Sequence, residues 1–73
     1  MDFKQKYFAI WQEVWALHKK YAFIQRSDSK AWDAFWVEVN ALKQKYAKTP
    51  ENGFVQNLIV AIAGEIERQS KTN

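Results

Sequence analysis

The sequence predicts an all-α protein that folds as one domain over residues 1–73, an antiparallel up-down-up three-helix bundle with an aromatic-rich core. Three observations lead to this prediction. Apolar residues recur every three or four positions in three segments, which is the spacing of one face of an α-helix. Two short polar breaks separate these segments. The two glycines and one proline leave few other places to interrupt a helix. No internal repeat is expected.

The first segment predicts a helix over residues 3–25, against which the other two are expected to pack. Asp2 is its predicted N-cap. Trp11, Trp15 and His18 widen its apolar arc on one side, so this helix should contact both of the others. Its predicted core seam is Phe3, Tyr7, Ile10, Val14, Leu17, Tyr21 and Ile24.

Two further helices are predicted over residues 30–47 and 50–69, and residues 70–73 are expected to fray. Asp28 or Ser29 should cap the second helix. Thr49 should cap the third, with Pro50 in its first turn. The alternative is a turn at Asn52-Gly53 with the helix starting at Phe54. The breaks are about 4–6 residues long, which forces neighbouring helices to be antiparallel. The predicted core residues are Trp32, Phe35, Trp36, Val39, Leu42 and Tyr46 in the second helix, and Val55, Leu58, Ile59, Ile62 and Ile66 in the third.

Burial of aromatic side chains is expected to supply most of the stability. The chain has no cysteine for a disulfide and a single histidine, so a structural metal site is not expected. Four Trp, three Tyr and five Phe are present, and each can bury about 150–250 Å². We therefore predict that the pairs Trp11/Trp15 and Trp32/Trp36 belong to the core, with Trp15 partly exposed. The alternative is an aromatic pocket for a ligand.

The sequence predicts a binding protein and not an enzyme. It offers no set of catalytic residues, no cofactor site, no metal-ligand set and no evident small-molecule substrate. His18 is expected to be a half-buried structural residue, since no nucleophile or acid lies near it in the sequence. No apolar run approaches the ~18 residues of a membrane span, and no signal-peptide pattern follows the first residues. A cytoplasmic protein without a membrane partner is expected.

A basic pole is predicted where the second helix ends beside the start of the first. The net charge is +3 and the isoelectric point about 9.3. Many of the cations lie at helix C-termini, where the helix dipole accounts for them without a ligand. Asp2 and Glu51 oppose them at the pole. Nucleic-acid binding at this pole is the alternative to a protein partner. The residues of the predicted pole are Lys4, Lys6, Lys43, Lys45 and Lys48.

A protein interface is predicted on the outward side of the third helix, which is apolar nearly all round between residues 58 and 63. A helix that is apolar on two sides is usually buried on both. Gly64 costs about 1 kcal/mol relative to Ala inside a helix, which suggests close approach of another helix. We therefore expect a homodimer. The predicted interface is Asn57, Val60 and Gly64, extended by Phe23 or Val37.

Two stretches of the chain resemble small uncharacterised helical proteins of bacterial mobile elements. They are Trp11-x-x-x-Trp15-x-Leu17-His18-Lys19-Lys20-Tyr21 and Phe54-Val55-x-x-Leu58-Ile59-x-Ala61-Ile62-x-x-Glu65-x-Glu67-Arg68. The resemblance covers nearly the whole chain and rests on packing motifs. It implies a bacterial cytoplasmic protein with a binding or assembly role, and it transfers no functional residue. The predicted function is protein–protein interaction, with self-association.

Overall fold

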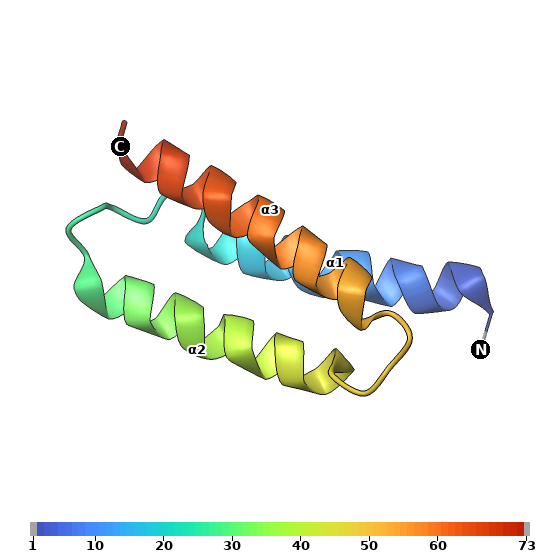
Figure 1. The fold of residues 1–73 in the computed structure, drawn as a ribbon. Coiled ribbons are helices and arrows are strands. Elements are labelled where there is room, and N and C mark those ends of the chain that lie inside the picture. The colour runs from blue at the N-terminus through green and yellow to red at the C-terminus, as the bar shows by residue number, and fades with distance from the viewer. Residues whose placement is uncertain (1, 73) are drawn as a thin grey trace.

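The computed structural model describes residues 2–72 and contains three helices, α1 (Phe3–Tyr21), α2 (Ser29–Tyr46) and α3 (Asn52–Ser70). Each pair of helices is in contact, and consecutive helices run in opposite directions (Figure 1). The predicted up-down-up three-helix bundle is therefore confirmed. The N-terminal end of α1 extends past its neighbours, and Phe3 is 76% exposed there although it begins the predicted core seam.

The buried core is mainly aliphatic, and aromatic side chains surround it. Phe35 lies at its centre with no exposed surface. The rings of Tyr21, Trp32 and Trp36 approach Phe35 edge-on, with centroids 5.3, 5.9 and 5.0 Å away. Edge-to-face contacts of this kind are favourable for aromatic rings. The buried hydrophobic residues are Ile10, Val14, Leu17, Tyr21, Ile24, Phe35, Val39, Leu42, Val55, Ile59, Ile62 and Ile66.

The first helix is shorter than predicted, because α1 ends at Tyr21 and not near residue 25. Beyond it the chain turns, and the Ile24 amide donates a hydrogen bond to the Tyr21 carbonyl. Ile24 leaves the helix but remains in the core. The Trp32 indole N–H donates to the Gln25 carbonyl and fastens the connection to α2. At the two helix starts, Asp2 and Asp28 act as the predicted N-caps.

The third helix begins two residues later than predicted, at Asn52. Thr49 does not cap it: its hydroxyl donates to the Tyr46 carbonyl at the end of α2. Residues 49–51 form a turn, and the Glu51 carbonyl accepts the helical bond from the Val55 amide. At the other end, Ser70 is not frayed as expected, since it is helical and buried. Its hydroxyl donates to a backbone carbonyl one turn earlier. Asn73, also predicted to fray, lies outside the described residues.

Gly64 tests whether anything approaches the outward side of α3. Apart from its chain neighbours and the backbone of its own helix, a Cβ added there meets no atom of the described chain within 4 Å. Gly64→Ala should therefore raise the free energy of unfolding by up to about 1 kcal/mol through helix propensity. Urea denaturation at low protein concentration measures this change, and Ala61→Gly on the same exposed helix is a control that should lower it by a similar amount. A less stable or less associated Gly64→Ala protein would reveal a neighbour at this position.

Candidate interaction surfaces

The structure does not gather the five residues of the predicted interface onto one surface. Val60 is 69% exposed on α3, and Asn57 and Gly64 are exposed on the same helix. Phe23 instead borders a hollow beside Lys20 and Ala31, at the connection between α1 and α2. Val37 is exposed on α2, between two fully buried neighbours at positions 35 and 39, and so points out of the bundle on a different helix.

The predicted basic pole is partly neutralised. Lys6 forms an ion pair with the buried Glu51 carboxylate at 3.3 Å. Lys45 pairs with Glu13 at 2.9 Å, within the contact between α1 and α2. Within residues 2–72, Lys4, Lys43 and Lys48 take part in no ion pair. These lysines belong to one end of the bundle, where α1 begins and α2 ends (Figure 1).

A group of exposed and partly exposed aromatic side chains lies along α1 and the start of α3. We call it the aromatic face; its residues are Phe3, Tyr7, Phe8, Trp11 and Trp15 of α1, and Phe54 of α3. Its rings form a connected series, with centroids 4.6 Å apart for Phe3 and Tyr7, 5.0 Å for Tyr7 and Phe54, and 5.8 Å for Phe54 and Trp11. Phe8 and Trp15 extend the series at helical spacing from Trp11.

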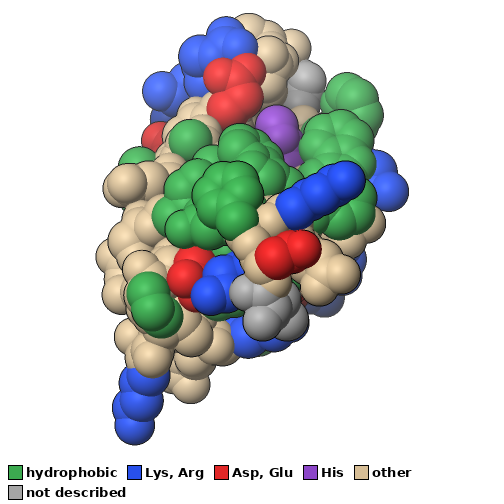
Figure 2. Space-filling model, turned by 90° about the vertical axis from the view of Figure 1, so that its right-hand side faces the viewer, with side chains coloured by type: hydrophobic (Ala, Val, Ile, Leu, Met, Phe, Trp, Pro, Cys, Tyr) green, Lys and Arg blue, Asp and Glu red, His purple; other side chains and the backbone are tan. Residues whose placement is uncertain are grey.

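This face leaves a large apolar area uncovered. Phe3, Phe8, Trp11 and Trp15 are 76%, 60%, 53% and 58% exposed. If a fully exposed aromatic side chain presents about 150–250 Å², these four leave roughly 500 Å² uncovered. Figure 2 shows hydrophobic side chains gathered in adjoining groups, with the histidine beside them.

The prediction that the two tryptophan pairs belong to the core is wrong for Trp11 and Trp36, whereas Trp15 is partly exposed as predicted. Trp11, Trp15 and Trp36 are exposed, and Trp32 alone is packed against the core. A three-helix bundle has room for one central row of side chains from each helix, and aliphatic residues with Phe35 and Tyr21 fill it. The wide apolar arc of α1 therefore extends past the core to the surface. Sequence reasoning identified this arc but interpreted its outer edge as buried.

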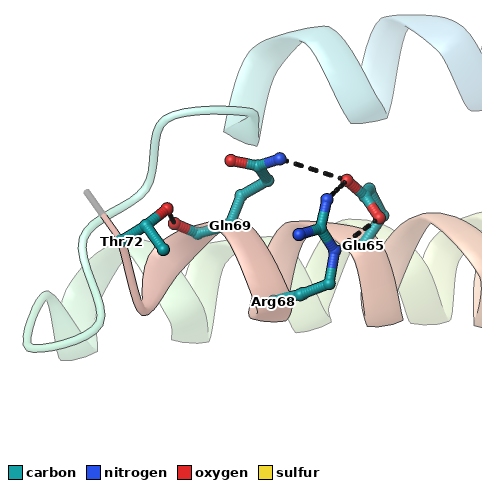
Figure 3. A network of polar contacts seen from close by, with 4 residues as sticks. All are labelled: Glu65, Arg68, Gln69 and Thr72. Atoms are coloured by element: carbon teal, nitrogen blue, oxygen red, sulfur yellow. Dashed lines mark hydrogen bonds and ion pairs between the residues drawn. The ribbon is translucent and has the colours of Figure 1, made fainter.

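His18 borders the aromatic face at a half-buried position, with its ring 6.0 Å from that of Trp15. Its charged neighbour is Glu65 of α3. Figure 3 shows the side chains of Glu65 and Gln69 reaching from α3 toward α1. Hydrogen bonds from Arg68 and then from Gln69 hold the pKa of Glu65 below its usual range. The carboxylate is thereby kept charged beside the histidine.

A second candidate surface is formed by polar contacts between α1 and α2. At one end of this helix pair, the Tyr21 hydroxyl donates a hydrogen bond to Glu38. Lys20 forms an ion pair with the same carboxylate at 2.9 Å. The Lys20 ammonium also lies 5.6 Å from the centre of the Tyr21 ring.

The same arrangement occurs at the opposite end of the helix pair. The Tyr46 hydroxyl donates to Glu13, and Lys45 forms an ion pair with Glu13 at 2.9 Å. The Lys45 ammonium lies 5.7 Å from the centre of the Tyr46 ring. Each helix therefore supplies one carboxylate, one ammonium and one phenol in equivalent positions.

This equivalence reveals an internal repeat with an offset of 25 residues, so the expectation of no repeat is wrong. Residues 9–22 correspond to residues 34–47. One of the pairs that are not identical is Ile10/Phe35, and both of its residues lie in the core. The repeat was missed because the segments were compared only by the spacing of their apolar residues. The identical pairs are Ala9/Ala34, Trp11/Trp36, Glu13/Glu38, Val14/Val39, Ala16/Ala41, Leu17/Leu42, Lys20/Lys45, Tyr21/Tyr46 and Ala22/Ala47.

Between these contacts runs a groove with a volume of about 380 Å³, which we call the α1–α2 groove. Its residues are four of the repeat pairs: Glu13/Glu38, Ala16/Ala41, Leu17/Leu42 and Lys20/Lys45. Because the helices are antiparallel and contribute the same residues, the groove has an approximate two-fold axis perpendicular to its floor.

The surroundings of the Tyr21 and Tyr46 hydroxyls raise the pKa of both groups. Hydrogen bonding to Glu38 raises the pKa of Tyr21, and its burial adds to this effect. Burial raises the pKa of Tyr46 to about 12, and the hydrogen bond to Glu13 contributes further. Hydrogen bonds from Tyr21 and then from Lys20 lower the pKa of Glu38. Near neutral pH both phenols are therefore protonated donors.

Comparison with protein-family models, curated proteins and solved structures found no match. In residues 2–72, no group of three or more His, Cys, Asp or Glu side chains is placed to bind a metal ion. No helix in this part of the chain has the length and apolar character needed to cross a bilayer.

Tyr46→Phe should reveal the hydrogen bond to Glu13 through the pH dependence of stability. At pH 7 the substitution should lower the free energy of unfolding by about 1–2 kcal/mol, because a bond to a charged acceptor is lost. The raised pKa means that the folded state keeps a proton which the unfolded state releases above pH 10. Wild-type stability should therefore fall between pH 10 and about 12, and its difference from Tyr46→Phe should shrink. Urea denaturation of both proteins across this range measures the difference, and a constant difference would contradict this assignment.

Proposed function

We propose that this protein is a non-enzymatic interaction module, and that the aromatic face binds another protein. The observation that carries the proposal is the adjoining set of four aromatic side chains, each more than half exposed. The largest apolar patch of a monomeric protein usually measures about 300–600 Å² and is often functional. The aromatic face reaches the upper part of that range.

The size and composition of the face suit the centre of a protein interface. A stable interface covers about 800 Å² on each partner, with an apolar centre and a polar rim. The aromatic face would supply most of such a centre. Tryptophan residues are also among the side chains that contribute most to binding energy.

The charges beside the face favour an acidic partner. Lys4 precedes Phe8 by four residues and Lys19 follows Trp15 by four, so both lie on the same side of α1. Neither lysine forms an ion pair among the described residues. Along a helix they are about 22 Å apart. A partner with an apolar centre and carboxylates at such a separation would match this pattern. A second copy would instead bring cations to the same edge.

The basic pole supports the alternative of nucleic-acid binding less well. Lys6 and Lys45 are already paired with carboxylates, which leaves few cations for a phosphate backbone. The bacterial origin and the cytoplasmic location implied by the resemblance remain predictions.

The aromatic face is tested by Phe8→Gln with Trp15→Gln, which removes apolar area from two exposed positions. Val60→Gln is the matched control, since it changes an exposed apolar residue on the far side of α3. Folding should be nearly unaffected in both variants, because exposed substitutions typically change stability by less than about 0.5 kcal/mol. Affinity capture from the native host, followed by mass spectrometry, should recover partners with the wild type and the control but not with the double variant. The same proteins recovered by all three would overturn the proposal.

A further inference from the structure

We propose that two copies of this chain also pair through the α1–α2 groove, which is a surface separate from the aromatic face. The proposal rests on the internal repeat and on the charges at the groove, and it adds self-association to the proposed binding of another protein. It differs from the predicted homodimer through α3, whose residues Asn57, Val60 and Gly64 lie on another helix.

The symmetry of the groove is the property that a symmetric dimer interface requires. A two-fold dimer uses the same patch on both copies, so that patch must be complementary to itself. All eight residues of the α1–α2 groove belong to repeat pairs, four from each helix. A partner that covers the groove therefore contacts the same types of residue in the same order from either end of the groove.

The four charged residues make the groove self-complementary. Glu13 lies beside Lys45 at one end, and Lys20 lies beside Glu38 at the other, so charges alternate both along and across the groove. If a second copy faces the groove after a half-turn about an axis parallel to the helices, Glu13 meets Lys45 and Glu38 meets Lys20. After a half-turn about the axis across the helices, Glu13 meets Lys20 and Glu38 meets Lys45. Opposite charges face each other in both arrangements.

The side chains between the charges permit a second copy to approach. Ala16 and Ala41 are exposed at the middle of the groove, and Leu17 and Leu42 form its buried floor. The distance between packed helices depends on the size of the side chains at the contact, so alanines allow close approach. The lysine side chains are about 60% exposed, and their alkyl stems are free to cover the floor of the facing groove. Because two Glu and two Lys cancel in net charge, the groove selects a matching alternating pattern and not a charged partner in general.

A charge-inverted protein tests this pairing rule. Glu13→Lys, Lys45→Glu, Glu38→Lys and Lys20→Glu together keep the net charge and reverse every charge at the groove. The inverted protein should pair with itself as the wild type does. A mixed pair would place like charges opposite each other in both arrangements. When tagged wild-type and inverted chains are mixed, native mass spectrometry should find mixed dimers at least ten-fold below random pairing. Random mixing would overturn the proposal.

A second variant covers the case in which the inverted protein loses stability with its tyrosine hydrogen bonds. Ala16→Gln with Ala41→Gln places larger side chains at two exposed positions and should weaken dimerisation at least ten-fold in sedimentation equilibrium. Val60→Gln should leave dimerisation unchanged, and so should the Phe8→Gln/Trp15→Gln protein. The last comparison separates this proposal from the proposed function, since each can fail alone. A wild-type chain that stays monomeric at about 500 μM, or a dimer unaffected at Ala16 and Ala41, would overturn the groove proposal.

Discussion

The pairing of α1 with α2 through two equivalent tyrosine–glutamate contacts organises this small protein. Each contact joins the C-terminal end of one helix to the middle of the other, so two such contacts fix both the direction and the register of the pair. The hydrogen-bonded carboxylates also hold a lysine each. Polar contacts at the border of the pair thereby align its aliphatic core residues, against which α3 packs.

A chain of this length cannot bury all of its aromatic side chains in a three-helix core. Only about 60% of the surface of so short an unfolded chain becomes buried on folding. The core accommodates Phe35 and Tyr21 fully, whereas Trp11 and Trp15 remain on the outside of α1. The exposed parts of these two side chains add no buried apolar surface to the monomer. The proposed contact of this side of α1 with a partner would account for the concentration of tryptophan there.

Apolar spacing was sufficient to predict the three helices and most of the core, because this spacing directly reflects which side of a helix is buried. It could not locate the end of α1, since Ile24 is buried from a turn and so continues the helical pattern. It also could not distinguish Trp11 at the surface from Ile10 in the core, because the width available to the core depends on the packing of all three helices. The repeat was present in the sequence, but its meaning depends on contacts such as Tyr21 with Glu38 and Tyr46 with Glu13.

Because the α1–α2 pair is approximately two-fold symmetric, α3 could pack against it in either of two opposite directions. On the side opposite the groove, the pair has two packing sites for α3 at corresponding positions of the repeat. Tyr7 and Trp11 form one site, and Trp32 and Trp36 form the other. Phe54 packs against the first site, whereas the second site lies beside the C-terminal turn of α3. The short turn from Ala47 to Glu51 allows α3 to start only from the end at which α2 finishes. Because α1 and α2 are similar, α3 could pack against the pair in either of two directions, and the short connection permits only one of them. A longer connection would also allow α3 to pack in the reverse direction.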